Sequence, residues 1–418
     1  MVDKSIALKK HKEHKGKVQI VGRVIIKNKN DLSIYYTPGV AYVSEAIKYN
    51  HELAYEYTNK GNTIAIVSDG TRILGLGNVG PEAGLPVMEG KSLLFKSYAG
   101  IDAIPICLGT TNEDEIINTI KHISPSIAGV NIEDIESPKS FRIIKKLSKA
   151  VDIPIFHDDQ YGTAVVTLAA LINALKIVKK DNSVKIVIFG AGSAGYGITK
   201  LLYFSGFKNL YVFDSKGIIK KNRKEDMNEF KEELANISNN ENKKYTIEEC
   251  ISNADVLIGV SGKKGYFKKE WIVNMAEKPI VFALTNPEPE IEYKQAIDAG
   301  AFIAATGRSN APNQVNNLIA FPGIMRGLLN ARAKGVSMDM LKTAAITIAS
   351  YTKKPKRDDI IASPLDEKVM REITEKMAID VGMKALDERG IKKYNKNIFK
   401  KVIKERIKEY SKFQNVIK

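Results

Sequence analysis

The sequence predicts an α/β protein with an N-terminal α/β domain and a second domain built on a doubly wound parallel sheet. Short apolar runs of strand length alternate with helical patterns along most of the chain, which is typical of βαβ units. The chain has 418 residues, enough for two domains at roughly 100–200 residues each. Hydrophobic residues make up 44% of it and charged residues 27%, so the composition suits well-filled cores.

Cysteine usage and hydropathy favour a cytoplasmic protein. Cys107 and Cys250 are far apart and too few for a disulfide framework, which indicates reduced thiols. Residues 1–17 lack the apolar core of a signal peptide. The most apolar expected helix, 163–178, is interrupted by polar residues and is too short and too polar to span a membrane. We therefore expect no membrane partner.

The net charge of +16 has two possible explanations. A nucleic-acid partner is one, and a lysine-rich surface is the other. The densest basic run, 392–418, has no interleaved aromatic residues, and no nucleic-acid module is visible in the sequence. We favour the lysine-rich surface and expect no nucleic-acid partner, although a basic surface attracts anionic substrates.

The N-terminal region combines a polar, basic start with a turn motif. Residues 1–30 predict a helix and a short strand, VQIVGRVII, at 18–26. Thr37-Pro38-Gly39 contains residues that favour a turn, and the apolar residues after it are spaced as in a helix. Tyr36 is therefore expected in a loop at a helix N-terminus, where a packing role is the alternative to a chemical one.

A strand at 62–70 leads into a loop rich in glycine, TRILGLGNVG, at 71–80. Glycines at this density let backbone approach a ligand closely. Arg72 and Lys91 bracket this region, and both suit a ligand that carries a carboxylate. The alternative is two exposed cations on a flexible loop.

Acidic pairs follow two of the next expected strands. After a strand at 103–108, the strand at 127–135 runs into Glu133 and Asp134. Because neighbouring strand residues point to opposite faces, both carboxylates reach one ion only where the strand gives way to a loop. The strand IPIF, at 153–156, precedes Asp158, Asp159 and a turn at Gly162.

These acidic residues predict a site for a hard divalent cation. The candidate ligands are Glu133, Asp134 and one of Asp158 or Asp159. All-carboxylate ligation suits Mg²⁺ or Mn²⁺ better than zinc. Carboxylates at strand ends also serve as helix caps, which is the alternative. We interpret His157 as structural.

The strongest motif is a dinucleotide fingerprint. A strand at 184–189 runs into Gly190, Gly192 and Gly195 and then a helix, and a second strand ends in Asp214. The glycines allow a tight turn and close approach to a pyrophosphate at the helix N-terminus. This context predicts a Rossmann-type domain that binds a dinucleotide.

Three more expected strands end in small or polar residues, at 254–262, 279–286 and 301–307. Open α/β sheets bind ligands at such strand ends, which places Asn286 and the loop 307–317 at the cofactor edge. Asn310 and Asn313 are expected to cap turns. Residues 318–385 predict helices, and a basic helix is expected to end the chain.

Taken together, the motifs resemble those of the malic enzymes, specifically the short bacterial and archaeal form. The matching segments occur in family order over roughly three-quarters of the chain: YTPGVA (36–41), DGTRILGLGNVGPEAGLPVMEGK (69–91), GVNIEDI (129–135), FHDDQYGTA (156–164), GAGSAG (190–195), TNPEPE (285–290) and ATGRSNAPNQVNNLIAFPGI (305–324). The large phosphotransacetylase-like domain of the long bacterial form is not expected here. Tyr161 and Asn310 stand where many bacterial relatives have His and Asp, which bears on fine specificity.

The resemblance implies oxidative decarboxylation of L-malate to pyruvate and CO₂, with NAD⁺ or NADP⁺ and a divalent metal. Tyr36 resembles the family's catalytic acid, Lys91 its base and Asp158 the partner of that lysine. Glu133, Asp134 and Asp159 resemble its metal ligands. The implied substrate contacts are Arg72, Lys91, Asn286 and Asn317, and the implied cofactor contacts are Gly190, Gly192, Ser193, Ala194, Gly195, Asp214 and Asn286.

The expected organisation is a substrate domain at 1–160, a Rossmann domain at 161–390 and a basic helix at 391–418, in a homodimer. Asp214 suits the ribose 2′-hydroxyl of NAD, whereas Ser215 and Lys216 could accept a 2′-phosphate, so the lean to NAD is slight. A malolactic-type or oxaloacetate decarboxylase of the same fold is the alternative enzyme. A catalytically silent nucleotide-binding or nucleic-acid-binding protein is the alternative from another class.

Overall fold

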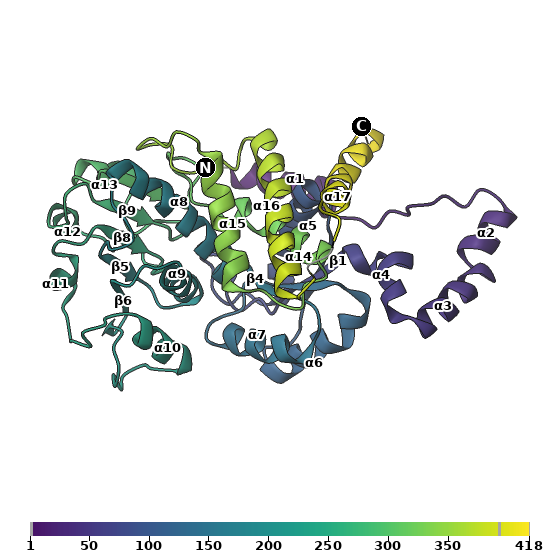
Figure 1. Cartoon of the computed structure of the whole chain (residues 1–418), viewed down its shortest axis with the longest axis horizontal. Coiled ribbons are helices and arrows are strands. Elements are labelled where there is room, and N and C mark those ends of the chain that lie inside the picture. Colours follow the sequence, from purple (N-terminus) through teal and green to yellow (C-terminus); the bar gives the residue numbers. More distant parts are fainter. Residues whose placement is uncertain (1–2, 392–393, 418) are drawn as a thin grey trace.

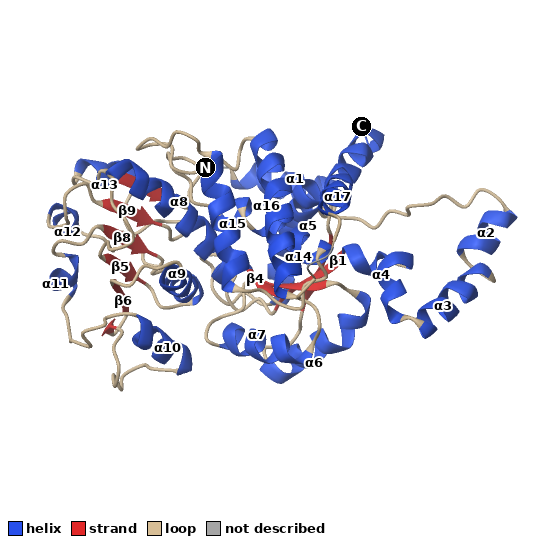
Figure 2. Cartoon of the chain, in the orientation of Figure 1, coloured by secondary structure: helices blue, strands red, loops and turns tan. Residues whose placement is uncertain are grey.

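The computed structural model describes residues 3–391 and 394–417 and contains two separate β-sheets flanked by helices (Figures 1 and 2). One sheet has four strands in the order β2-β1-β3-β4, and the other has six in the order β10-β9-β8-β5-β6-β7. Every strand pair is parallel except β6 with β7. The predicted α/β fold with a doubly wound parallel sheet is confirmed.

The four-stranded sheet lies in the N-terminal half. Its strands are β1 (Thr63–Ser68), β2 (Asp102–Cys107), β3 (Gly129–Ile132) and β4 (Ile155–His157). Helices α5 (Pro81–Ala99), α6 (Glu113–Ile123) and α7 (Lys139–Ala150) connect them. Three of the strands, β1, β3 and β4, are buried along their whole length, as parallel strands covered on both faces are.

Local sequence signals set the ends of these helices. Pro81 opens α5 at a position where its missing N–H is not needed, and Gly100, at φ 64°, ends it in the left-handed conformation. Asn112 caps α6 by accepting hydrogen bonds from two backbone N–H groups. One apolar stripe along α7 is buried against the sheet.

The six-stranded sheet carries the glycine motif. Its strands are β5 (Ile186–Phe189), β6 (Leu210–Asp214), β7 (Gly217–Ile218), β8 (Val256–Gly259), β9 (Ile280–Ala283) and β10 (Ile303–Thr306). Its helices are α9 (Ser193–Phe204), α10 (Glu229–Ile237), α11 (Ile247–Ile251), α12 (Lys269–Val273) and α13 (Tyr293–Asp298). Strand order reverses direction at β5, between β6 and β8. Ligands bind at such a switch point, beyond the carboxyl ends of the strands.

A long apolar helix joins the two halves. A short π-helical turn, η4 (Asp158–Gly162), continues directly into α8 (Thr163–Val178). Helix α8 has the predicted bounds, but with the turn the helical segment reaches 21 residues, Asp158–Val178, so the expectation that it is too short and too polar to cross a membrane is wrong. By length and composition this helix is apolar enough to cross a membrane, yet 72% of its most apolar window is buried inside the protein, as in a core helix.

The C-terminal helices follow the second sheet and, apart from the last one, lie between the two sheets in Figure 1. They are η5 (Asn317–Ile319), α14 (Phe321–Asn330), α15 (Met338–Tyr351), α16 (Glu367–Glu388) and α17 (Lys396–Ile417). Helices α14 and α16 contact α5, and α15 contacts α8. The rings of Phe321 on α14 and Phe95 on α5 meet edge to face at 4.8 Å. Residues 392–393 and 418 of the expected basic helix lie outside the described residues.

The N-terminal region forms short helices: α1 (Lys4–His14), α2 (Lys29–Tyr35), α3 (Gly39–Tyr49), η1 (His51–Leu53), α4 (Ala54–Tyr57) and η2 (Asn59–Asn62). Helices α2 and α3 form a lobe that stands away from the body (Figure 1). The strand predicted at 18–26 is wrong, because no strand among residues 3–391 and 394–417 pairs with that extended segment. A strand pattern forms sheet only where an edge is available.

Candidate active site

The carboxyl ends of β3 and β4 bring two acidic pairs together. Glu133 and Asp134 directly follow β3, and Asp158 and Asp159 directly follow β4. The two strands are parallel neighbours, so their carboxyl ends meet at one edge of the sheet. Asp134 adopts a φ of 51°, which turns the chain out of the strand direction at this point.

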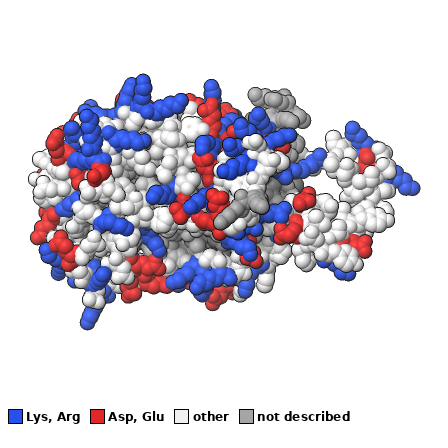
Figure 3. Space-filling view, viewed as in Figure 1, with Lys and Arg blue, Asp and Glu red and all other residues white. Residues whose placement is uncertain are grey.

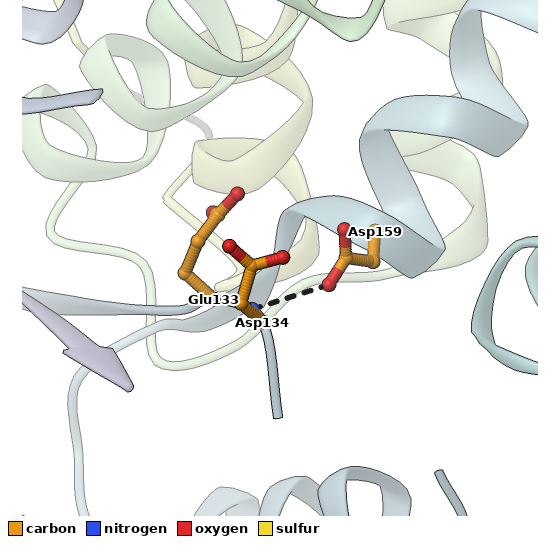
Figure 4. Close-up of side chains that lie close together, drawn as sticks. All are labelled: Glu133, Asp134 and Asp159. Carbon is orange, nitrogen blue, oxygen red and sulfur yellow. Dashed lines mark hydrogen bonds between the residues drawn. The ribbon is translucent and has the colours of Figure 1, made fainter. Parts of the chain in front are cut away.

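Three of these side chains form a cluster. One carboxylate oxygen from each of Glu133, Asp134 and Asp159 lies within 4.8 Å of the others (Figure 4). The backbone N–H of Asp134 also donates to Oδ2 of Asp159 at 3.3 Å. The sequence left open whether Asp158 or Asp159 is the third candidate ligand. In the structure Asp159 joins the cluster, and Asp158 faces Lys91.

The electrostatics of the cluster fit a divalent cation. Burial and the neighbouring carboxylates raise the pKa of Glu133 to about 7 and that of Asp134 to about 9. Oδ2 of Asp134 is buried and has no hydrogen-bond partner among the described residues. Three clustered carboxylates with such an unpaired oxygen are the donor set that Mg²⁺ or Mn²⁺ prefers.

His157 lies behind the cluster, as its structural interpretation expects. It is fully buried, and its Nε2 lies 3.6 Å from Oδ2 of Asp159. Burial raises the pKa of Asp159, but the neighbouring His157, Lys91 and Arg72 outweigh burial and hold that pKa below its ordinary value. The carboxylate of Asp159 is thereby kept ionised beside its neighbours.

Lys91 lies at the centre of the site. It projects from α5, and its Nζ lies 2.5 Å from Oδ2 of Asp158 and 2.9 Å from Oε1 of Glu133. Nζ also lies 4.3 Å from the ring centre of Phe321. Burial lowers the pKa of Lys91, but the carboxylates of Asp158 and Glu133 outweigh burial, so the net pKa is above the ordinary value.

Amide side chains orient the carboxylates around Lys91. Nδ2 of Asn317 donates to Oδ2 of Asp158 at 2.6 Å. Nδ2 of Asn131 donates to Oε2 of Glu133 at 2.7 Å. Asn131 and Phe321 were not singled out from the sequence, because an amide within a strand and an aromatic residue in a helix are usually packing residues.

Arg72 connects the acidic cluster to the glycine motif. Its backbone N–H donates to the carbonyl oxygen of Asp134 at 3.1 Å. A Cβ placed on Gly192 would lie 3.5 Å from its Nη1. The guanidinium thus lies beside the expected dinucleotide loop, on an exposed side chain that a ligand can reach.

The glycine motif has the backbone that its spacing predicts. Gly190 has a φ of 118°, and a Cβ there would lie 2.4 Å from the carbonyl oxygen of Val260. A Cβ on Gly195 would lie 1.7 Å from the carbonyl oxygen of Gly190, so no side chain fits at either position. Ser193 and Ala194 begin α9, and the buried Oγ of Ser193 has no hydrogen-bond partner among the described residues. An unpaired hydroxyl at a helix N-terminus suits a phosphate oxygen.

Asp214 ends β6, and cations hold its carboxylate. Arg223 donates to both of its oxygens, Lys231 lies 2.8 Å from Oδ2, and the N–H of Lys216 donates to Oδ1 at 2.8 Å. Burial raises the pKa of Asp214, but these donors outweigh burial and lower the net value. Arg223 and Lys231 were missed from the sequence, where they are two cations among many.

Two predicted site residues lie farther from the cluster. Asn286 follows β9 and is exposed beside Gly307, where an added Cβ would lie 2.5 Å from its Nδ2. Tyr36 lies between α2 and α3 in the protruding lobe, and its side chain is 65% exposed. The structure brings Lys91, Arg72 and Asn317 to the acidic residues but leaves Tyr36 in the lobe, apart from them.

Comparison with known proteins adds the family. Residues 14–115 match the family model "Malic enzyme, N-terminal domain", and residues 160–386 match "Malic enzyme, NAD binding domain". The bifunctional malic/malolactic enzyme of Bacillus subtilis is 46% identical over 388 residues, which cover 92% of this chain and 93% of that protein. An NADP-dependent malic enzyme of Rhizobium meliloti is 41% identical over 83% of this chain and 46% of its own length.

The fold is also similar to that of a solved malic enzyme structure. The NAD-dependent malic enzyme of Thermotoga maritima superposes with a TM-score of 0.86 at 47% identity, covering 90% of this chain and 99% of that one. A Rossmann domain joined to a second α/β domain, with the polar cluster beside the glycine loop, defines a nicotinamide-dependent oxidoreductase. The chain belongs to the malic enzyme family.

Proposed function

We propose that this chain oxidises and decarboxylates L-malate to pyruvate and CO₂, reducing a nicotinamide dinucleotide and requiring Mg²⁺ or Mn²⁺. The observation that carries the proposal is the position of Lys91, within 2.9 Å of Glu133 and 2.5 Å of Asp158, at the edge where Arg72 approaches Gly192. Base, acidic cluster and cofactor loop therefore adjoin one another, as hydride transfer from a hydroxy acid requires.

Substrate binding is assigned to the polar residues around this edge. Arg72 would hold a malate carboxylate by paired N–H···O bonds. Asn317 and Asn286 would contact the same ligand from the cofactor side. Glu133, Asp134 and Asp159 would hold the cation, which would act as a Lewis acid on the 2-oxygen and the C1 carboxylate.

Lys91 is assigned the proton steps at the 2-oxygen. The amine would take the proton of the substrate 2-hydroxyl, and a bound nicotinamide would supply the hydride acceptor for C2. Burial lowers the pKa of Lys91, but the adjacent carboxylates of Asp158 and Glu133 outweigh burial and hold that pKa above its ordinary value. Lys91 can therefore act as a base only when a cation other than the lysine compensates the charge of Glu133. Asp158 then remains beside the amine and orients it.

Tyr36 is assigned the last proton transfer. Loss of CO₂ from the β-keto acid leaves an enolate, which needs a proton at C3 to become pyruvate. A phenol is a suitable donor, and the proton that Lys91 removed restores the balance. The structure leaves Tyr36 apart from Lys91. This proton transfer therefore requires the lobe of α2 and α3 to lie against an active site, so that the phenol reaches the enolate.

We also propose NAD as the preferred cofactor. Asp214 is ionised at the end of β6, where a carboxylate accepts hydrogen bonds from a ribose 2′-hydroxyl. A 2′-phosphate would instead compete with Asp214 for Arg223 and Lys231. Gly190, Gly192, Ser193, Ala194 and Gly195 would receive the pyrophosphate, and Asn286 would contact the nicotinamide side.

The cellular and domain assignments are also proposals. We propose a cytoplasmic homodimer without nucleic-acid or membrane partners, with a substrate domain at 1–160, a Rossmann domain at 161–390 and a basic helix at 391–418. Both signs of charge are interspersed over the body in Figure 3, which supports a solvated surface rather than a nucleic-acid face.

Purified protein tests the function. With L-malate and Mn²⁺, we expect pyruvate and reduced nicotinamide in equal amounts with NAD⁺ or, more slowly, with NADP⁺. A malolactic reaction is the second candidate, favoured by the name of the Bacillus subtilis relative, and lactate in place of pyruvate would identify it. Absence of turnover with both cofactors would contradict the proposal.

A further inference from the structure

A buried carboxylate lies between two strand ends at the cofactor edge, and the proposed reaction does not use it. Glu290, the last residue of TNPEPE (285–290), is 0% exposed. Its carboxylate accepts hydrogen bonds from the backbone N–H of Ser261 at 2.8 Å and from Oγ of Ser261 at 2.9 Å. It also accepts from the backbone N–H of Thr285 at 3.2 Å and from Oγ1 of Thr285 at 2.5 Å. These neutral donors replace the water that burial removes from the carboxylate.

The donors belong to two separate strand ends. Ser261 follows β8 and Thr285 follows β9, which are parallel neighbours, so Glu290 ties together the loops beyond both strands. Both hydroxyls are oriented by a further bond. Oγ of Ser261 accepts from the N–H of Lys263 at 3.2 Å, and Oγ1 of Thr285 accepts from the N–H of Gly262 at 3.0 Å. Their own hydrogens are therefore directed at Glu290.

The chain leaves room for this carboxylate. A Cβ placed on Gly259, the last residue of β8, would lie 2.5 Å from Cδ of Glu290, so a side chain there would displace the carboxyl group. The backbone of Glu290 is also held, because the N–H of Phe267 donates to its carbonyl oxygen at 2.9 Å. Glu290 is thus fixed through both its side chain and its main chain.

The loop after β8 lies against the dinucleotide loop. A Cβ placed on Gly190 would lie 2.4 Å from the carbonyl oxygen of Val260 and 3.2 Å from the N of Ser261. The peptide group that donates to Glu290 therefore packs directly on the first glycine of the motif. A shift of this peptide group would be felt at the cofactor edge, because the backbones are already in contact.

The loop after β9 reaches two other parts of the site. Asn286 directly follows Thr285, and a Cβ placed on Gly307 would lie 2.5 Å from its Nδ2. A Cβ placed on Gly75 would lie 2.8 Å from Cδ of Pro287. The loop that Glu290 holds therefore also touches the glycine-rich loop at 71–80, which carries Arg72.

The strand order indicates which half of a dinucleotide faces these loops. Asp214 ends β6 on one side of β5, whereas β8 and β9 lie on its other side. The two halves of a dinucleotide bind on opposite sides of such a switch point. The ribose that Asp214 suits belongs to the adenosine half, so the loops after β8 and β9 face the nicotinamide half.

We propose that Glu290 is a positioning residue for the nicotinamide half of the cofactor. It holds the loops after β8 and β9 in the conformation that binds the nicotinamide and its ribose, without contacting either group itself. Loops that are already ordered bind a ligand with a smaller loss of entropy, which is the physical basis of the effect. The proposal rests on the proposed function only for the role of Asn286.

Glu290→Gln removes this function without creating a cavity. A glutamine amide has one acceptor oxygen and one NH₂ donor group. The two carboxylate oxygens of Glu290 accept from different backbone N–H groups, of Ser261 and of Thr285. Whichever way the amide is turned, its NH₂ group faces one of these N–H groups. One of the two loops must therefore move, while the volume of the side chain is retained.

Calorimetric titration with NAD⁺ and with ADP-ribose tests the proposal. ADP-ribose contains the adenosine and the pyrophosphate but lacks the nicotinamide. Glu290→Gln should raise the Kd for NAD⁺ by about tenfold and change that for ADP-ribose by less than about twofold, because only loops on the nicotinamide side have lost hydrogen bonds to a charged acceptor. The matched control is Glu288→Gln in the same motif, where the side chain is 51% exposed and pairs with Lys264. The control should bind both ligands as the wild type does.

Two outcomes would overturn the proposal. One is wild-type affinity of Glu290→Gln for both ligands, and the other is an equal loss for both, which a general loss of structure would cause. If circular dichroism shows that Glu290→Gln does not fold, Thr285→Val decides, since it removes one hydroxyl donor and keeps the backbone N–H. It should weaken NAD⁺ binding alone, and unchanged affinity for NAD⁺ would refute the role of Glu290. These titrations contain no malate, so a wild-type protein without turnover would contradict only the proposed function.

Discussion

Lys91 and Asp158, 67 residues apart in the sequence, form an ion pair with 2.5 Å between Nζ and Oδ2. The side chain of Asp158 is fully buried, and that of Lys91 is 10% exposed. A buried pair of this kind is costly to break, because either partner alone would be an uncompensated charge. The pair joins α5 to the beginning of the long helix that leads into the cofactor sheet.

Replacing Lys91 with alanine should abolish malate oxidation. General-base catalysis contributes about 10²–10⁴-fold to a rate, so kcat should fall by at least that much. Dinucleotide binding should survive, because the glycine loop belongs to another sheet. Steady-state kinetics and fluorescence titration measure the two effects. Lys96→Ala, on the same helix but paired with Asp102, is the control that should keep turnover.

Replacing Gly162 with alanine should disturb the site through Asp158. A Cβ at position 162 would lie 2.0 Å from Oδ1 of Asp158 and 3.1 Å from Cβ of Asn317, so the carboxylate must move away from Lys91. Such overpacking should reduce the free energy of unfolding by about 1–3 kcal/mol and lower kcat. Urea denaturation and kinetics measure both. Gly109→Ala, where a Cβ meets open space, should change neither.

Divalent cations should stabilise the protein more at higher pH. Glu133 and Asp134 have folded-state pKa values of about 7 and about 9, whereas both ionise near pH 4 when unfolded. The folded state without a cation thus binds more protons in this window, and its free energy of unfolding falls as pH rises from about 4 to about 9.

A bound cation replaces those protons, so the rise in Tm on adding Mn²⁺ should be larger at about pH 8 than at about pH 6. Thermal unfolding with and without Mn²⁺ measures this difference. Asp159→Asn should reduce the Mn²⁺ effect at both values of pH. An equal rise in Tm at both would contradict the assignment of the cluster.

Replacing Asp214 with serine should shift cofactor preference toward NADP. The change removes the carboxylate that a 2′-phosphate would meet and releases Arg223 and Lys231 to bind that phosphate. The ratio of kcat/KM for NADP to that for NAD should rise by about tenfold, which corresponds to roughly 1.4 kcal/mol. Asp226→Asn, which alters another partner of Lys231, should leave the ratio unchanged.

The parts that sequence reasoning predicted correctly depend on short-range rules. The dinucleotide loop is an example, because the bond geometry of a tight turn excludes a side chain at Gly195 wherever the motif occurs between strand and helix. The parallel strands of both sheets were also found, since buried parallel strands read as apolar runs, whereas the short antiparallel strand β7 was missed. The turn after β3 followed from the alternation of strand residues at Glu133 and Asp134.

Contacts between distant segments decided the rest. Only tertiary contacts separate Asp158 from Asp159, which are identical and adjacent in the sequence: Asp159 joins the acidic cluster, and Asp158 pairs with Lys91 of α5. Arg223, in the loop before α10, and Lys231, on α10, became partners of Asp214 through the fold of the chain after β6. The segment 18–26 has the pattern of a strand, but none of the strands in the described part of the chain pairs with it. Side-chain pairing and strand pairing depend on which distant segments the fold brings into contact. A local sequence pattern carries no information about those contacts.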